Sequence, residues 1–254
     1  MSLPEMDEPH TKLQGESPSP ECLGIIPARG GSKGIPGKNL FPVGGKPLLY
    51  WTLKCARESR SLTRSIVSTD SPEIAEAARD YSGEVPFMRP VELAADDTPG
   101  VDVVLHALEW LESNEGYRPE LVMVLQPTSP LRTSDQIDAC ADLLLMRNAS
   151  AVVSVTEVQY HPYWMKLVDA DGVLRDFMTI DGPYHRRQDV PTMYAPNGAL
   201  YLVRRSVLMA RRTLFPEGTL AFIMAQSSSL DVDTPWDAHL ADLILREQHE
   251  DRIH

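Results

Sequence analysis

The sequence has few cysteines, and none of them is paired in a motif. Cys22, Cys55 and Cys140 are far apart, odd in number and form no CxxC pair. This spacing excludes a disulfide framework and a zinc knuckle, both of which need cysteines in even, closely spaced sets. The chain is therefore predicted to keep reduced thiols, as proteins of the cytoplasm do.

Long apolar runs are also missing. No apolar stretch approaches the roughly 20 residues that span a bilayer, and the N-terminus lacks the basic-then-apolar order of a secretory signal. These absences predict a soluble, cytoplasmic protein without a membrane partner. Residues 1–21 are rich in Pro, Ser and Glu, a composition typical of disorder, and are predicted to form a disordered leader.

Positive charge is scarce, because 24 Lys and Arg residues stand against 36 Asp and Glu residues and leave a net charge of -12. A general nucleic-acid binder needs a basic face to neutralise backbone phosphates, so no nucleic-acid partner is expected. No HExxH motif and no Ser/His/Asp order stands out, which leaves hydrolase functions with little support. The few cations can still bind a small anionic ligand where they converge.

The 254 residues, 43% of them hydrophobic, suffice for one α/β domain, predicted over residues 22–254. Apolar patterning predicts strands at residues 65–69, 121–125, 151–155, 199–203 and 220–224. Helices are expected to start at Pro47, at Ser71-Pro72, near residue 101, near Thr133 or Ser134, and at Thr234-Pro235. This alternation predicts a doubly wound, mainly parallel sheet that binds ligands at the carboxyl ends of its strands.

Residues 159–196 interrupt the alternation with His161-Pro162, Asp181-Gly182-Pro183 and a cluster of Arg and Tyr residues. This segment is interpreted as an excursion from the main sheet and is predicted to be a dimerisation arm. Asn197-Gly198 then predicts a turn into the following strand.

Residues 25–40 combine glycines and cations in one loop directly after a short apolar run. Glycines let backbone amides approach phosphate oxygens, while Arg29, Lys33 and Lys38 supply positive charge, so the loop is predicted to cradle a polyphosphate. It is neither a Walker A motif nor a dinucleotide fingerprint, since the spacings of both are absent. The alternative is a solvated basic turn.

Asp231 and Asp233 lie two residues apart just before the last predicted helix. In an extended segment such side chains share a face, so the pair can hold one Mg2+ together with substrate phosphates. The alternative is a pair of solvated turn or capping residues. The magnesium interpretation requires that these carboxylates meet the cations of the front loop in space.

Two further groups have the chemistry to bind a sugar acid. Gln126 follows the predicted strand 121–125 and can hydrogen-bond hydroxyl groups, unless its amide only satisfies nearby backbone. Lys166, Arg186 and Arg187 lie in the excursion, where a solvated surface is the default. A guanidinium binds a carboxylate bidentately, which makes Arg187 the stronger candidate.

Several segments together resemble the acylneuraminate cytidylyltransferases, or CMP-sialic acid synthetases, and their relatives that activate legionaminic and other nonulosonic acids. The resemblance covers roughly residues 23–245. It depends on these segments: PARGGSKG at 27–34, PGKN at 36–39, STD at 68–70, RP at 89–90, LQPTSPLR at 125–132, RQ at 187–188, NGA at 197–199 with Tyr201, and DVD at 231–233.

The resemblance implies a Rossmann-like nucleotidyltransferase that uses CTP and Mg2+, acts as a homodimer and transfers CMP to the anomeric hydroxyl of a nonulosonic acid. On the nucleotide side it implies Arg29 and Lys38 at the triphosphate, Ser32, Lys33 and Asn39 in support, and Arg89 at the cytosine ring. For the metal it implies Asp231 and Asp233. On the sugar side it implies Gln126, Asn197, Tyr201 and Phe215. Lys166 and Arg187 are expected to reach the sugar carboxylate, either in the same chain or from the partner chain of a dimer.

Three positions depart from the family pattern. Gly100 stands where a serine is expected near the cytosine, Ala195 where some relatives have Arg, and Leu214-Phe215 where an aromatic pair packs on the N-acyl group. These departures leave the sugar open. The base that accepts the hydroxyl proton is open between a hydroxide on the metal and a water near Gln126.

Three other functions compete with this interpretation. One is a nucleotidyltransferase for another sugar, such as 3-deoxy-manno-octulosonate, which should lack the segments at 187–188 and 197–199. Another is a DxD glycosyltransferase, although such enzymes usually carry the motif mid-chain. A non-catalytic CTP sensor is disfavoured because Arg29, Lys38, Asp231 and Asp233 are all present.

Overall fold

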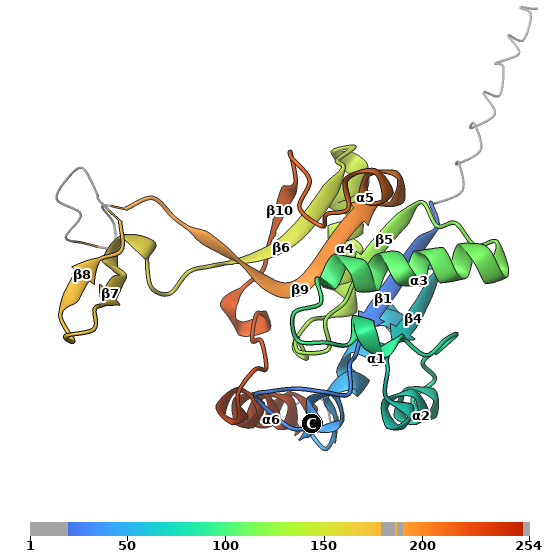
Figure 1. The fold of residues 1–254 in the computed structure, drawn as a ribbon, viewed down its shortest axis with the longest axis horizontal. Coiled ribbons are helices and arrows are strands. Elements are labelled where there is room, and N and C mark those ends of the chain that lie inside the picture. The colour runs from blue at the N-terminus through green and yellow to red at the C-terminus, as the bar shows by residue number, and fades with distance from the viewer. Residues whose placement is uncertain (1–19, 179–185, 187–189, 251–254) are drawn as a thin grey trace, which may run out of the picture.

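A computed structural model describes residues 20–178, 186 and 190–250 of the chain. Its main body is a six-stranded sheet in the order β10-β6-β9-β5-β1-β4 (Figure 1). The strands are β1 (Cys22–Pro27), β4 (Arg64–Ser68), β5 (Leu121–Val124), β6 (Ala151–Glu157), β9 (Tyr194–Arg204) and β10 (Leu220–Ile223). The helices are α1 (Leu48–Glu58), α2 (Pro72–Asp80), α3 (Gly100–Glu115), α4 (Ser134–Met146), α5 (Arg205–Arg211) and α6 (Pro235–Glu250).

Most neighbouring strands are parallel, which confirms the predicted α/β class. β1 is parallel to β4 and β5, and β10 is parallel to β6. Only β9 runs antiparallel to its neighbours β5 and β6 among the strands of the described sheet. β6 and β9 are paired at Glu157 and Tyr194, so the chain leaves β6, forms the excursion and returns along the same strand. Such a direct return without a crossover makes an antiparallel pair.

Alternating side chains of the central strands pack on opposite faces of the sheet. Ile26 and Met123 lie in a core cluster with residues of α1, α2 and α4, whereas Ile25 and Val124 pack with α3 and α5. The period of two along each strand explains this division, since successive side chains point to opposite faces. Because β1, β4 and β5 are parallel, their carboxyl ends lie at the same edge of this sheet.

Local capping chemistry defines the starts of three helices as predicted. The Ser71 side chain accepts a hydrogen bond from the Ile74 amide, with Pro72 at the first position of α2. Thr133 forms a reciprocal capping box with Gln136 at the start of α4. Before α6, Thr234 and Asp237 exchange the same kind of hydrogen bonds.

The prediction of a turn at Asn197-Gly198 is wrong, because both residues lie inside β9. The local conformational reason for it is nevertheless present, since Gly198 has a φ of 76°. Pairing of β6 with β9 shifts register between Val153 and Val155, so the extra residues of β9 form a bulge there. The bulge places Gly198 next to the side chain of Gln126.

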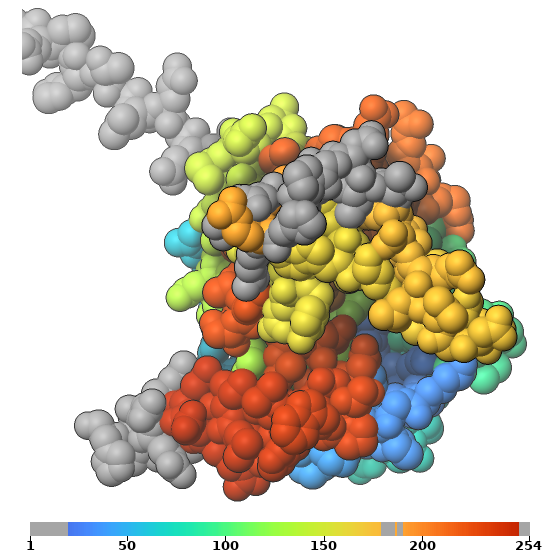
Figure 2. Space-filling model, turned by 90° about the vertical axis from the view of Figure 1, so that its left-hand side faces the viewer, coloured from blue at the N-terminus to red at the C-terminus, as the bar shows by residue number. Residues whose placement is uncertain are grey.

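The predicted excursion is a separate arm that projects from the main sheet (Figure 1). It contains the two-stranded hairpin of β7 (Lys166–Val168) and β8 (Leu174–Asp176), preceded by the short 3-10 helix η3 (Pro162–Trp164). Figure 2 views the molecule from the side of this arm, which lies in front of the body and above α6. Large apolar side chains of the hairpin are exposed: Leu167, Val168, Val173, Leu174 and Phe177.

Short elements complete the described chain. They are the 3-10 helices η1 (Lys38–Leu40), η2 (Val91–Leu93) and η5 (Gln226–Ser228), and the paired strands β2 (Pro42–Val43) and β3 (Lys46–Pro47). None of the helices in the described ranges combines the length and apolar character needed to cross a bilayer. Most of the predicted leader, residues 1–19, lies outside the described residues.

Candidate active site

The glycine-rich loop leaves the carboxyl end of β1 and borders a cavity of about 320 Å³. The other walls come from the loop before α3 and the loop after β5. Six of the residues predicted to bind substrate line this cavity together: Arg29, Ser32, Lys38, Asn39, Arg89 and Gln126. Residues from three separate parts of the sequence therefore converge at the edge of the sheet that α/β folds use for ligands.

Hydrogen bonds within the loop hold its backbone in place. The Asn39 side-chain amide donates to the Arg29 carbonyl at 2.9 Å, and the Gly30 amide donates to Asp70 Oδ1 at 2.9 Å. Gly37 takes a left-handed φ of 62° just before η1 begins. Asn39 thus orients the chain beside Arg29, while the cations remain on the cavity side.

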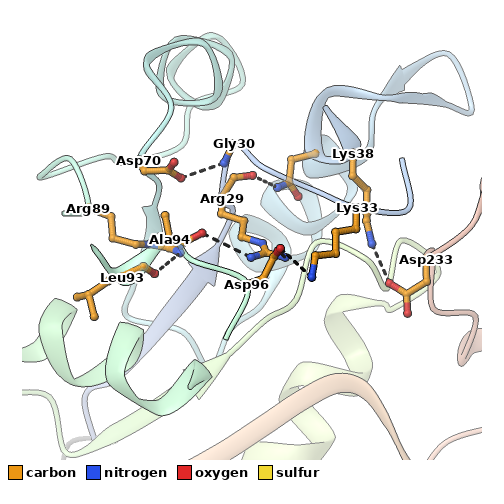
Figure 3. A network of polar contacts seen from close by, with 11 residues as sticks. Arg29, Gly30, Lys33, Lys38, Asp70, Arg89, Leu93, Ala94, Asp96 and Asp233 are labelled. Atoms are coloured by element: carbon orange, nitrogen blue, oxygen red, sulfur yellow. Dashed lines mark hydrogen bonds and ion pairs between the residues drawn. The ribbon is translucent and has the colours of Figure 1, made fainter. Parts of the chain in front are cut away.

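Two loop cations pair with a carboxylate that the sequence analysis missed. Arg29 Nη2 lies 2.8 Å from Asp96 Oδ1, and Lys33 Nζ lies 2.9 Å from Asp96 Oδ2 (Figure 3). The hydrogen bond from Lys33 lowers the pKa of Asp96, and Arg29 adds to the shift. A carboxylate therefore neutralises the cations predicted to bind phosphates.

Arg89 is buried, with 5% of its surface exposed, and its guanidinium holds neighbouring loops. Its Nε donates to Ser68 Oγ at 3.0 Å, and its Nη2 donates to the Ser68 carbonyl. Its Nη1 donates to the Leu93 carbonyl at 3.4 Å (Figure 3). Burial lowers the pKa of Arg89 to about 10, and the nearby charge of Arg29 acts in the same direction. Contact of Arg89 with a cytosine ring stays a prediction.

The front loop and the acidic tail segment meet beside the cavity. Lys38 Nζ lies 2.7 Å from Asp233 Oδ1, although the two residues are 195 positions apart in the sequence (Figure 3). The backbones also touch, because a Cβ added to Gly34 would lie 2.1 Å from the Asp233 carbonyl oxygen. Val232 is buried and its amide donates to the Thr128 carbonyl at 2.8 Å. The predicted meeting of cations and carboxylates is confirmed.

The Asp231 carboxylate is half-buried and has an oxygen without a hydrogen-bond partner among the described residues, as expected of a group that binds a cation. Burial raises its pKa, and the negative charge of Asp233 adds to the shift. Its Oδ1 is buried without a hydrogen-bond partner among the described residues. In the same part of the chain no cluster of three or more His, Cys, Asp or Glu forms a metal site. Two carboxylates beside a phosphate cavity fit Mg2+, which often takes its other ligands from phosphates and water.

A second group of predicted residues lies on the other side of Asp231. A Cβ on Gly198 would lie 2.9 Å from Gln126 Oε1 and 3.7 Å from Asp231 Oδ2, so the bulge of β9 brings these groups together. Burial raises the pKa of Tyr201, and the charge of Asp231 contributes. The Tyr201 ring packs edge-on against Phe215 with 5.6 Å between centroids. Polar groups of Gln126 and Asp231 thus lie close to the bulge of β9, and Tyr201 adds an aromatic ring near Asp231.

The sequence of the chain also matches a known protein family. The family model described as cytidylyltransferase matches residues 23–223. The chain belongs to the cytidylyltransferase family. The predicted resemblance is thereby confirmed. The matched range includes the glycine-rich loop, whereas Asp231 and Asp233 follow its end at residue 223.

Two curated relatives of this cytidylyltransferase-family chain illustrate the range of similarity. The N-acylneuraminate cytidylyltransferase of Streptococcus agalactiae serotype V is 35% identical over 212 residues, which are 83% of this chain and 50% of that protein. The CMP-N,N'-diacetyllegionaminic acid synthase of Legionella pneumophila is 30% identical over 230 residues, 90% of this chain and 97% of that protein. The chain thus spans about half the length of the streptococcal relative and nearly all of the Legionella one.

A solved structure of CMP:2-keto-3-deoxy-manno-octonic acid synthetase complexed with CTP shares the fold. It superposes with a TM-score of 0.67 over 90% of this chain and 99% of that chain, at 18% identity. The doubly wound, Rossmann-like prediction is confirmed by this likeness.

Two predicted sugar-side residues, Asn197 and Lys166, have other partners in the described structure. Asn197 is 6% exposed, and its side chain bonds Ser154, Ser229, Met224 and the Ala199 amide. It therefore holds the bulge instead of facing a ligand. Lys166 lies on the projecting arm and pairs with Asp176, and Arg187 lies outside the described residues.

Three residues act through tertiary contacts that the sequence pattern does not reveal. Asp96 pairs with the loop cations, Gly34 contacts the Asp233 backbone, and Asp237 accepts a hydrogen bond from the Asp233 amide at 3.2 Å. The acidic pair at 96–97 was the one available signal for Asp96, and nothing in the sequence places it near the basic loop.

Proposed function

We propose that this protein transfers the cytidylyl group of CTP to the anomeric hydroxyl of a nonulosonic acid and releases pyrophosphate. The contact between Lys38 and Asp233 carries the proposal, because it joins the phosphate-binding cations to the metal-binding carboxylates at one cavity. The names of the relatives, which include acylneuraminate and legionaminic acid enzymes, support CTP and this class of sugar acid.

In the proposed reaction the sugar hydroxyl oxygen forms a bond to the α-phosphorus of CTP. The bond from that phosphorus to the oxygen bridging the β-phosphorus breaks, and its electron pair leaves with pyrophosphate. The hydroxyl proton passes to a water or hydroxide at the site. The protein mainly positions the reactants and offsets charge. Arg29, Lys33 and Lys38 bind the triphosphate. Arg29 and Lys33 then exchange their ion pairs with Asp96 for contacts with the phosphates.

Asp231 and Asp233 would hold a divalent cation, for which the unpartnered Oδ1 of Asp231 is the supporting observation. When bound, Mg2+ offsets the negative charge that develops on the phosphates. Lys38 donates to Asp233 in the free protein, and nucleotide binding would exchange this partner for the phosphates. Gln126 and Tyr201 orient the sugar beside Asp231.

A homodimer is the second part of the proposal. The exposed apolar side chains of the β7–β8 hairpin support it, because such a patch on a projecting arm is typical of an interaction site. In a dimer, Lys166 and Arg187 would reach the partner's sugar pocket. Replacing Leu174 with Lys should shift the protein to monomers in sedimentation velocity experiments, and an unchanged dimer would contradict the arm's role.

A cytoplasmic location stays a prediction, motivated by three free, buried cysteines.

An octulosonic acid is the second candidate substrate, because the synthetase for such an acid shares the fold. The higher identity to enzymes named for nine-carbon acids favours the first candidate. A glycosyltransferase function is disfavoured by the same family membership.

Pyrophosphate release tests the function directly. CTP, UTP, GTP and ATP are each combined with neuraminic, legionaminic, pseudaminic and octulosonic acids, with Mg2+ and with chelator. The proposal predicts release with CTP, one or more nonulosonic acids and free metal. Release with a different nucleotide, or with the octulosonic acid alone, would replace the proposed substrates.

A further inference from the structure

A buried guanidinium lies beneath the sugar side of the site. Arg132 is 3% exposed, and its Nη1 donates to the carbonyls of Gln126 at 3.1 Å and Ala199 at 2.8 Å. Its Nη2 donates to Thr52 Oγ1 at 2.6 Å. Arg132 therefore joins three segments: the loop after β5, the bulge of β9, and α1.

All three acceptors are uncharged, and the described part of the chain gives Arg132 no carboxylate as ion-pair partner. A buried charge without a counter-charge is costly, and apolar side chains of similar volume often serve packing equally well. What an apolar side chain cannot supply is a rigid fork of donors that holds two carbonyls at a fixed separation. The chemistry of Arg132 thus indicates positioning rather than packing.

The groups that Arg132 holds are those that shape the sugar pocket. The Gln126 carbonyl also accepts from Thr52 Oγ1 at 3.4 Å and from the Ser129 amide at 3.4 Å. Ala199 directly follows Gly198, whose Cβ position lies 2.9 Å from Gln126 Oε1. Holding both carbonyls fixes the side chain of Gln126 against the bulge and next to Asp231.

Gln126 also lines the cavity beside the triphosphate cations, but those cations are held by other partners. In the described structure Arg29 and Lys38 are held by Asp96 and Asp233, and neither contacts Arg132 or Thr52. A disturbance of Arg132 therefore reaches the sugar pocket through Gln126 and Ala199, whereas the triphosphate cations keep their supports.

We propose that Arg132, together with the Thr52 hydroxyl, is a positioning residue for the sugar-acid subsite. This inference rests on the proposed function, since it concerns the second substrate of that reaction. It assigns Arg132 no contact with either substrate. Its effect is to set the separation between Gln126 and the bulge of β9.

Two substitutions test the inference, with a third as matched control. Arg132→Lys keeps the charge and removes the fork, and Thr52→Val removes a hydroxyl at nearly constant volume. Ser59→Ala removes a buried hydroxyl from the end of the same helix, where Ser59 bonds Asp138 Oδ1 at 2.6 Å, away from the site. KM for the sugar acid, KM for CTP and thermal unfolding are measured for each protein.

We expect Arg132→Lys to raise the KM for the sugar acid by about 10-fold or more and Thr52→Val by about 3-fold, with the KM for CTP within about 2-fold of wild type. Ser59→Ala should lower the unfolding temperature without changing either KM. Unchanged sugar KM in both variants, or equal rises in both KM values, would overturn the inference. If Arg132→Lys fails to fold, Thr52→Val decides.

Hydrogen exchange separates failure of this inference from failure of the proposed function. In the free protein, Arg132→Lys should speed exchange of amides at residues 126–132 and 197–200, and Ser59→Ala should not. Faster exchange confined to these segments supports the positioning role even if wild type transfers no cytidylyl group, which would refute the function alone. Unchanged exchange refutes the positioning role.

Discussion

Replacing Gly34 with Ala should separate the front loop from the acidic tail. The added Cβ would lie 2.1 Å from the Asp233 carbonyl oxygen, whereas real Cβ contacts essentially never fall below 3.0 Å. Both groups belong to the backbone, so no side-chain rotation relieves the overlap, and the two segments must move apart by roughly 0.9 Å. Overpacking of this kind costs about 1–3 kcal/mol.

The displacement matters because Asp233 also contacts Lys38 at 2.7 Å. A misplacement of about 1 Å in a positioned site can cost about 10²-fold in rate, so we expect a loss of that order in pyrophosphate release. The thermal unfolding temperature should fall by about 2–10 °C, given the expected loss of stability and the length of the chain.

Gly31→Ala is the matched control, because a Cβ there would meet no atom within 4 Å. It should leave the unfolding temperature unchanged. Wild-type stability and turnover in Gly34→Ala would refute the close approach of loop and tail. Equal losses of stability in both variants would show that the loop is sensitive to any Cβ and would refute the specific contact.

Three further predictions concern charge. Asp96→Asn frees Arg29 and Lys33, so CTP should bind about 2–5-fold more tightly in calorimetry, which is the scale of an exposed ion pair. The control Asp97→Asn should not change CTP binding. Weaker binding in Asp96→Asn would contradict the competition between Asp96 and phosphates. Lys38→Ala should raise the KM for CTP by about 10-fold or more with the fold intact, and unchanged CTP saturation would remove Lys38 from the site. The pKa of Asp231 in the folded state lies above its ordinary value of 3.8, so the folded protein keeps the Asp231 proton up to a higher pH than the unfolded chain does. Ionisation of Asp231 therefore lowers the stability of the folded state as the pH rises from 3.8 through the folded pKa. Asp231→Asn should therefore raise the unfolding temperature at pH 7 by roughly 2–4 °C and leave it unchanged well below pH 3.8, and a lower temperature at pH 7 would contradict the burial of an unpaired carboxylate.

Helix starts were predictable from sequence because their causes are local. Ser71, Thr133 and Thr234 each satisfy backbone amides within three residues, and no distant contact is needed to place them. The alternation of strands and helices likewise sufficed for a mainly parallel sheet.

The direction and shape of β9 were not predictable in this way. Asn197-Gly198 has the local preference of a turn, and Gly198 indeed adopts a positive φ. Pairing with β6 along the return from the arm makes the same residues a bulge instead. Strand pairing depends on partners far along the chain, so local preference gave the right dihedral angle and the wrong element.

The residues of the site likewise divide into those that their chemistry predicts and those whose roles depend on tertiary packing. Chemistry alone indicated that Lys38 and Asp233 would meet, because a metal-bound triphosphate needs both cations and carboxylates. It gave no reason to place Asp96 on Arg29, or Arg132 beneath Gln126, since those contacts depend on how loops pack. Asn197 shows the converse, because a residue of suitable chemistry is consumed by internal hydrogen bonds.

The most direct test of the central claim is the rate of pyrophosphate release by Asp233→Asn at saturating Mg2+ and CTP. Asp242→Asn on α6, where the carboxylate bonds Gly44 and Arg246 away from the cavity, is the control for charge. If the front cations and the tail carboxylates act together on a metal-bound triphosphate, Asp233→Asn lowers the rate by about 10²-fold or more and Asp242→Asn leaves it near wild type. A near-normal rate in Asp233→Asn would contradict the account.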